Sequence, residues 1–271
     1  MRQIGTIAGI LVVGYLAIVT LLALAQTQLL FPRWMIVSTP TLPDTAVPLA
    51  LEREAGVTLH GHLLPGAAPA DTRPLLLGFG GNATDAAELA LFLHDVLPEH
   101  DVAVFHYRGY GPSDGRPSAA ALLDDALAQF DSLQSDASGR GVVTVGFSIG
   151  VGPAAHLAGE RDLAGVVLVT PFDTLHAVAR QHYPWIPVDW LFRHHMAPRT
   201  SLAGSATPIA LITATRDTII PPQRADALAQ ALETNEPGVV FNARIDAGHN
   251  DIYARSDFHA ALREAVEAVS P

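Results

Sequence analysis

Short apolar segments alternate with longer helix-forming segments along most of this chain. Runs rich in valine, isoleucine and leucine and bounded by glycine or proline are typical of strands buried on both faces. We expect such strands at 49–53, 57–64, 74–79, 102–106, 141–145, 165–170, 208–214 and 239–245. The helices expected between them lie at 85–97, 118–133, 148–158, 222–232 and 257–269. This alternation predicts an α/β fold with a mostly parallel central sheet and helices on both faces.

The start of the chain departs from this alternation, because residues 4–25 are predominantly apolar and carry no charged side chain. A helix of this length crosses the ~30 Å hydrocarbon core of a bilayer at ~1.5 Å per residue. The alternatives are a buried core helix and a cleaved signal peptide, with Ala23-Leu24-Ala25 as its small-residue cleavage site. The apolar stretch exceeds the roughly 7–15 residues of a signal peptide's core, so we expect an uncleaved transmembrane signal anchor over residues 1–31.

The charges around this segment bear on its orientation. Arg2 and the terminal amine precede it, and Arg33 follows it. This near balance slightly favours an amino terminus inside the cytoplasm, with the rest of the chain outside it, in the periplasm of a bacterium. Residues 32–47 contain several prolines and threonines and are expected to form an extended linker without packing. Residues 48–271 are long enough for one globular domain.

The composition disfavours several classes of function. The net charge is -11 and every basic residue is an arginine, which disfavours nucleic acid as a partner because its phosphates require a basic face. The chain has no cysteine, which excludes disulfides, thiol catalysis and thiolate metal sites. The pair His194-His195 has no carboxylate or cysteine at ligand spacing nearby, so we expect no metal site and no cofactor.

Residues 146–150 read Gly-Phe-Ser-Ile-Gly and lie between a predicted strand and a predicted helix of small residues. In this strand–turn–helix context the pattern indicates a nucleophile elbow, a sharp turn that presents the serine hydroxyl at the edge of the sheet. Gly146 and Gly150 suit such a turn because strand and helix approach too closely for a Cβ atom. Ser148 is therefore the candidate nucleophile.

A serine nucleophile needs a general base and an orienting carboxylate, which in this kind of fold follow it in the order acid, then histidine. Asp217 comes just past one late predicted strand, and His249 follows the last one in a glycine-containing loop. The order and the strand-end positions predict a triad of Ser148, Asp217 and His249. The open alternatives are Asp246 or Asp173 as the carboxylate, Asp217 as a turn residue and His249 as a surface histidine.

Acyl transfer also needs backbone N–H donors aimed at the developing oxyanion. One donor is expected from Ile149, the residue after the nucleophile, and the other from the loop after the third strand. That loop reads Gly80-Gly81-Asn82, in which the glycines allow the N–H groups to turn inward. Asn82 is the expected second donor, and an ordinary glycine-rich turn is the alternative.

Taken together, these motifs resemble the Bem46-like branch of the α/β-hydrolase superfamily, which includes the ABHD13- and ABHD17-like membrane-associated serine hydrolases. The resemblance covers nearly the whole chain and implies an α/β-hydrolase fold in which Ser148 is the nucleophile, His249 the general base and acid, and Asp217 its orienter. The sequences that carry it lie at 29–32, 80–83, 107–115, 146–150, 183–187 and 248–251, together with Asp217 before Pro221.

The chain departs from this family's pattern at two places. The family has histidine where this chain has Gly80, which loosens the predicted oxyanion loop, and residues 193–198 differ from the usual sequence. Neither departure touches the predicted triad.

Two further segments lie at the predicted active-site edge. Within 107–111, Arg108 is expected to pair with a carboxylate and brace the loop rather than to shape the pocket. The interval 171–204 interrupts the alternation and is rich in aromatic residues, which predicts a short cap over an acyl pocket. The alternative is a connecting helix packed on the core. The residues expected to line the pocket are Gly81, Tyr110, Trp185 and Trp190.

The sequence thus predicts a membrane-anchored serine hydrolase that cleaves carboxylic ester or thioester bonds of a small or lipid-like acyl substrate. An amidase or peptidase of the same fold is one alternative. A catalytically silent binding protein anchored in the membrane is the other. The sequence carries no signal for the oligomeric state.

Overall fold

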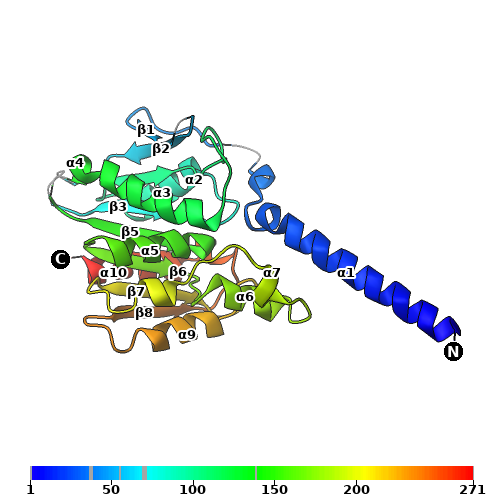
Figure 1. The fold of residues 1–271 in the computed structure, drawn as a ribbon. Helices are drawn as coiled ribbons and strands as arrows, with labels where there is room; N and C mark the ends of the chain where they lie inside the picture. The colour runs from blue at the N-terminus through cyan, green and yellow to red at the C-terminus, as the bar shows by residue number, and fades with distance from the viewer. Residues whose placement is uncertain (1, 37–38, 55, 69–71, 138, 271) are drawn as a thin grey trace.

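A computed structural model describes residues 2–36, 39–54, 56–68, 72–137 and 139–270. Its centre is an eight-stranded sheet with the order β1-β2-β4-β3-β5-β6-β7-β8 (Figure 1). Only β2 runs antiparallel to its neighbours β1 and β4, and every other pair of neighbours is parallel. The strands are β1 (Val47–Glu52), β2 (Thr58–Leu64), β3 (Leu75–Phe79), β4 (Val102–Phe105), β5 (Val142–Phe147), β6 (Gly165–Val169), β7 (Ile209–Ala214) and β8 (Val239–Ile245).

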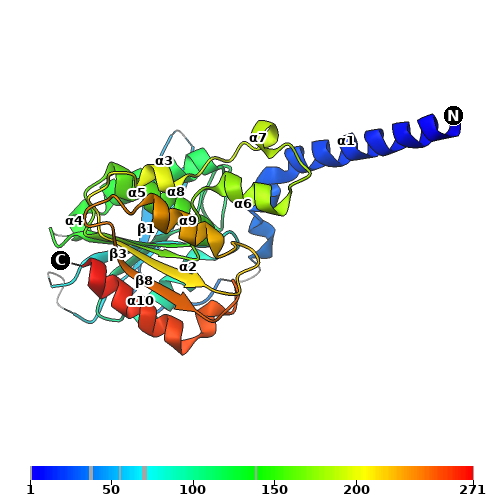
Figure 2. The same cartoon turned by 90° about the horizontal axis from the view of Figure 1, so that it is seen from below.

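Helices cover both faces of this sheet, as Figure 2 shows. One face carries α2 (Ala86–Val96) and α10 (Ser256–Val269), and the other carries α3 (Ala119–Ser132), α5 (Val151–Glu160), α8 (Pro198–Ser201) and α9 (Gln223–Ala231). A further single turn, α4 (Gln134–Ala137), follows α3. The predicted strands, helices and layered α/β architecture are therefore confirmed, with boundaries that differ by one to a few residues.

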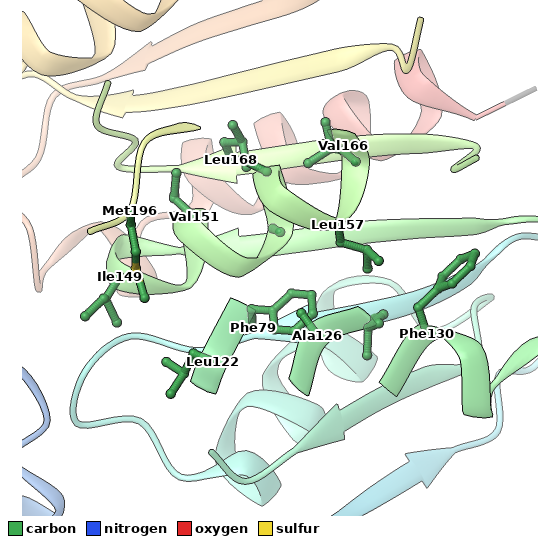
Figure 3. Packing of buried hydrophobic residues seen from close by; sticks show 14 of the residues in the cluster. Phe79, Leu122, Ala126, Phe130, Ile149, Val151, Leu157, Val166, Leu168 and Met196 are labelled. Atoms are coloured by element: carbon green, nitrogen blue, oxygen red, sulfur yellow. The ribbon is translucent and has the colours of Figure 1, made fainter. Parts of the chain in front are cut away.

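The sheet separates two apolar layers because successive side chains of a strand point to opposite faces. On β5, Val143, Val145 and Phe147 pack on the side of α2 and α10, whereas Val142 packs on the side of α3 and α5. The layer around α3 and α5 is shown in Figure 3. Both layers are nearly free of solvent, and they fix the ends of the strands from which the site is built.

The segment after α1 is not the unpacked, extended linker that the sequence predicts. It contains a short 3-10 helix, η1 (Arg33–Met35), and Phe31 just before it is only 2% exposed. Leu42 and Ala46 pack against the apolar layer on the α2 side, and the Thr39 hydroxyl donates to the buried carboxylate of Asp85 at 3.0 Å. The prediction of an unpacked linker is wrong, because the few apolar side chains of this proline-rich segment are enough to pack it against the core. Residues 37–38 lie outside the described residues.

The longest helix, α1 (Arg2–Leu30), extends away from the domain and contacts it through residues from Tyr15 to its carboxyl end (Figure 1). Within Gln3–Leu30, an 18-residue stretch has a mean hydropathy of 2.7, and the helix is long and apolar enough to cross a membrane. The contact is made with the segment between β6 and β7, which holds α6 (Leu175–His182) and α7 (Val188–Leu191) besides α8. We call residues 171–204 the cap.

Candidate active site

A sharp turn between β5 and α5 carries the predicted nucleophile. Ser148 opens a 3-10 turn, η2 (Ser148–Gly150), with a φ of 53°, an unfavourable conformation for a residue with a side chain. A Cβ at Gly146 would lie 2.5 Å from the Gly150 carbonyl oxygen, and one at Gly150 would collide with the carbonyl oxygen of Phe79. The two glycines are therefore required because the elbow is too tight for side chains.

The three predicted triad residues meet at the carboxyl ends of β5, β7 and β8. His249 Nε2 lies 3.0 Å from Ser148 Oγ, and His249 Nδ1 lies 2.6 Å from Asp217 Oδ2. The other oxygen of Asp217 accepts hydrogen bonds from the N–H groups of Ile219 and Ile220, at 2.8 and 2.7 Å. These bonds fix the carboxylate, which in turn orients the imidazole with its Nε2 lone pair toward the serine hydroxyl.

The two alternative carboxylates do not contact His249. Asp173 is buried and pairs with Arg224 at 3.3 Å, and Asp246 is exposed and pairs with Arg216 at 2.7 Å. All three members of the predicted triad are at most 9% exposed, so water around the hydrogen-bonded chain is limited.

The loop after β3 faces the nucleophile, as expected for an oxyanion loop. A Cβ at Gly81 would lie 3.7 Å from the Cβ of Ser148, and Asn82 and Ile149 both border the cavity above the serine. Two buried tyrosines hold this loop from behind. The Tyr107 hydroxyl donates to the Gly80 carbonyl at 2.7 Å, and the Tyr110 hydroxyl donates to the Asn82 carbonyl at 2.8 Å.

The two tyrosines explain how the loop is held without a histidine at position 80, and they show that Tyr110 is not a pocket residue. Burial raises the pKa of both hydroxyls, so they stay protonated donors. They fix two carbonyls of the loop although Gly80 stands where the family that the sequence resembles has histidine. The prediction that Tyr110 lines the pocket is wrong, because its side chain is 1% exposed and lies behind the loop. The role of Tyr107 was not predicted, since a tyrosine after a strand has no pattern that distinguishes a brace from a core residue.

A cavity of about 370 Å³ opens above Ser148. Its wall is built mainly from apolar side chains of three segments: the end of α1, the cap and the loop after β7. The residues that border it are Leu22, Ala23, Gln26, Leu29, Leu30, Asn82, Ser148, Ile149, Phe172, Leu175, Val178, Ala179, His182, Tyr183, Ile186, Val188, Leu191, Phe192, Thr218, Ile219 and Ile220.

The cap contributes to this cavity, but not through the tryptophans that the sequence singles out. Trp190 is 89% exposed and Trp185 is 49% exposed, and neither borders the cavity. The reason is the single turn of α7, in which Val188 and Leu191, three residues apart, face inward and leave Trp190 outside. The ring of Trp185 instead packs edge-on against Tyr15 of α1, with 6.3 Å between ring centroids.

The predicted structural role of Arg108 is confirmed. Its guanidinium donates to both oxygens of the buried Asp125, at 3.0 and 2.6 Å, and also pairs with Glu54. The hydrogen bonds that Arg108 donates to Asp125 and Glu54 raise its pKa. Arg108 therefore braces the loop after β4.

His194, the first residue of the histidine pair, joins α1 to the start of α3. His194 Nε2 lies 2.9 Å from Thr27 Oγ1 of α1, and its Nδ1 accepts from the Ala119 N–H at 3.4 Å. Burial lowers the pKa of His194, which agrees with the neutral ring that these two contacts require. Within the described ranges, no group of three or more histidine, aspartate or glutamate side chains is arranged to hold a metal ion.

Comparison with known proteins places the chain among relatives of this architecture. No family model matches it. An uncharacterized protein of Mycobacterium tuberculosis is 34% identical over 208 residues, which cover 75% of this chain and 72% of that protein. The lysophosphatidylserine lipase ABHD12 of Danio rerio is 25% identical over 228 residues, which cover 74% of this chain but only 60% of the lipase.

Solved structures agree in fold. The α/β hydrolase of Vibrio vulnificus aligns with a TM-score of 0.67 at 20% identity, covering 83% of this chain and 81% of that one. The Pyrococcus furiosus esterase Pf2001 aligns with a TM-score of 0.66 at 18% identity, covering 85% and 95%. Together with the strand order of the sheet, these structures show that the chain has the α/β-hydrolase fold.

Proposed function

We propose that this protein is a membrane-anchored serine hydrolase that cleaves carboxylic ester or thioester bonds through an acyl-enzyme. The observation that carries the proposal is the continuous hydrogen-bonded chain from Asp217 through His249 to Ser148, at the floor of an apolar cavity. A serine on a strained elbow, beside a histidine oriented by a carboxylate, is the arrangement that activates a hydroxyl as a nucleophile.

In the proposed reaction, Ser148 Oγ attacks the carbonyl carbon while its proton passes to His249 Nε2. The N–H groups of Ile149 and Asn82 stabilise the resulting oxyanion. When the tetrahedral species collapses, the bond to the leaving group breaks and His249 protonates the departing alcohol or thiol. His249 then takes a proton from water, which attacks the acyl-enzyme, and the acid is released as the proton returns to Ser148 Oγ.

The substrate proposed is a small or lipid-like acyl compound. The mainly apolar wall of the cavity supports an aliphatic acyl group, because such a group gains free energy by leaving water. ABHD12, a relative that this chain covers in part, is named a lysophosphatidylserine lipase, which agrees with a lipid-like substrate.

The proposed organisation is an anchor at 1–31, a connecting segment at 32–47 and a catalytic domain at 48–271 that includes the cap at 171–204. The length and hydropathy of α1 support the anchor. The proposed orientation has the catalytic domain outside the cytoplasm.

The full-length protein in detergent micelles tests this proposal with p-nitrophenyl esters from acetate to palmitate. Ser148→Ala and His249→Ala should abolish turnover, and Asp217→Asn should lower kcat by about 10⁴-fold, as the same change does in a serine protease triad. The matched control is Asp246→Asn, which changes an exposed aspartate that does not contact His249 and should leave kcat unchanged. No turnover on any ester by the folded wild type would contradict the proposal and favour a binding role.

A further inference from the structure

One wall of the cavity above Ser148 belongs to α1 and not to the globular domain. The residues of α1 that border the cavity are Leu22, Ala23, Gln26, Leu29 and Leu30. Their spacing of three, four and seven residues places them on a single face of the helix. The opposite face carries Leu21 and Leu24, which are 65% and 67% exposed. The end of α1 is therefore oriented toward the cavity.

A buried glutamine fastens this face of α1 to the cap. Gln26 is 7% exposed, and its side-chain amide both donates to and accepts from the backbone at the end of α7 and just beyond it. Its Nε2 donates to the Leu191 carbonyl at 3.1 Å, and its Oε1 accepts from the Arg193 N–H at 2.8 Å. The contact between Thr27 and His194, at 2.9 Å, lies one residue further along the helix. A helix that served only as a tether would need no such bonds.

The length of α1 locates the cavity relative to the bilayer. The helix has 29 residues and is ~44 Å long at ~1.5 Å per residue, whereas the hydrocarbon core is ~30 Å thick. About 20 residues fill that core, so a span that begins at Gln3 reaches its far side near Leu22. Leu22 borders the cavity, which places the outer end of the cavity at the surface of the hydrocarbon core.

The tip of the cap reaches further toward the bilayer than Leu22 does. The Tyr15 hydroxyl donates to the Trp185 carbonyl at 2.9 Å, seven residues before Leu22 in the helix. Figures 1 and 2 show α6 and α7 beside the carboxyl-terminal part of α1. Trp185 and Trp190 are exposed on this tip, and their large apolar rings gain free energy when they contact lipid instead of water.

From these observations we propose that α1 forms part of the acyl-binding pocket and that the acyl chain enters from the bilayer, between α1 and the cap. This inference rests on the proposed hydrolase function and adds the route and the specificity-determining residues Leu22 and Leu29. A lipid-like substrate would then slide its chain along the pocket face of α1 and bring its ester bond to Ser148, without leaving the membrane.

The first test compares two tryptophan substitutions on opposite faces of α1, in the full-length protein reconstituted in phosphatidylcholine nanodiscs. Leu22→Trp narrows the pocket, and Leu24→Trp adds the same side chain on the opposite, exposed face. The measured quantity is the ratio of kcat/KM for p-nitrophenyl palmitate to that for the acetate. Leu22→Trp should lower this ratio roughly tenfold or more, since a single methylene in an apolar pocket changes kcat/KM by about 10- to 200-fold. Leu24→Trp should keep the wild-type ratio.

The second test does not depend on the folding of Leu22→Trp. The chain has 3 tryptophans, so Trp34→Phe with Trp190→Phe leaves Trp185 as the only one. In vesicles of phosphatidylcholine with brominated acyl chains, its fluorescence should be quenched more strongly by the lipid bromine than by aqueous iodide.

The outcomes separate this inference from the proposed function. A wild type that hydrolyses no ester would contradict the function itself. An active wild type with the same chain-length ratio in Leu22→Trp and Leu24→Trp, or a Trp185 quenched mainly by iodide, would overturn bilayer entry along α1 and leave the hydrolase proposal intact.

Discussion

Tyr107 and Tyr110 provide a test of how the oxyanion loop is held. Each hydroxyl donates to a carbonyl of that loop, at 2.7 Å to Gly80 and at 2.8 Å to Asn82. Tyr→Phe removes only the donor and leaves the carbonyl without its partner. The Gly80 bond is buried and the Asn82 bond is partly buried, so the two substitutions should differ in cost.

The magnitude follows from burial. A buried polar group that loses its partner costs about 1–3 kcal/mol, so Tyr107→Phe should lower the free energy of unfolding by about 2–3 kcal/mol and Tyr110→Phe by about 1 kcal/mol. The order for catalysis should be the reverse, because Tyr110 holds Asn82, the residue proposed as the second oxyanion donor. Loss of one such donor lowers kcat by about 10²- to 10³-fold, and a loosened donor should cost roughly tenfold.

Two assays check these values on the full-length protein in detergent. Urea unfolding followed by circular dichroism gives the change in stability, and p-nitrophenyl acetate hydrolysis gives kcat and KM. Tyr110→Phe should lower kcat with little change in KM, because the oxyanion forms only in the transition state. Tyr15→Phe is the control, since its exposed hydroxyl bonds to Trp185 away from the loop. Wild-type kcat in Tyr110→Phe would refute the role assigned to this tyrosine.

Gly150→Ala should prevent formation of the elbow, because the new Cβ would collide with the Phe79 carbonyl oxygen; a melting temperature and an esterase rate equal to those of wild type would contradict this. Asp125→Ala should destabilise the domain by about 3 kcal/mol in urea unfolding, since it removes the main partner of the buried Arg108 guanidinium, and a change below ~0.5 kcal/mol would argue against that role. Burial lowers the pKa of several histidines below 6.5. Below that pH the unfolded state therefore binds more protons than the folded state, and the free energy of unfolding should fall as the pH is lowered. A urea midpoint that stays constant or increases when the pH is lowered from 7.5 to 5.5 would be inconsistent with neutral buried rings. These histidines are His62, His100, His106, His156 and His194.

Much of the fold could be predicted from the sequence because its signals are local. A buried parallel strand is a short apolar run, and an elbow is a glycine–serine–glycine turn between a strand and a helix. The grouping of Ser148, Asp217 and His249 follows from the same logic, since parallel strands bring their carboxyl ends to one edge of the sheet. The structure adds the hydrogen bonds that join these side chains.

The features that could not be predicted depend on contacts between distant parts of the chain. Gln26 bonds to Leu191, 165 residues away, and nothing in an apolar helix indicates which of its faces meets another element. The outward position of Trp190 depends on a single helical turn, too short to produce a periodic pattern. Aromatic composition alone therefore placed Trp185 and Trp190 in the pocket, whereas the aliphatic residues beside them border it.

Covalent labelling shows whether Ser148 is an activated nucleophile. The full-length protein in detergent would be treated with a fluorophosphonate and examined by intact-mass and peptide mass spectrometry. An activated Ser148 should give one adduct, on Ser148, that is absent in Ser148→Ala and forms far more slowly in His249→Ala. A folded wild type that stays unlabelled, or an adduct on another residue, would contradict it.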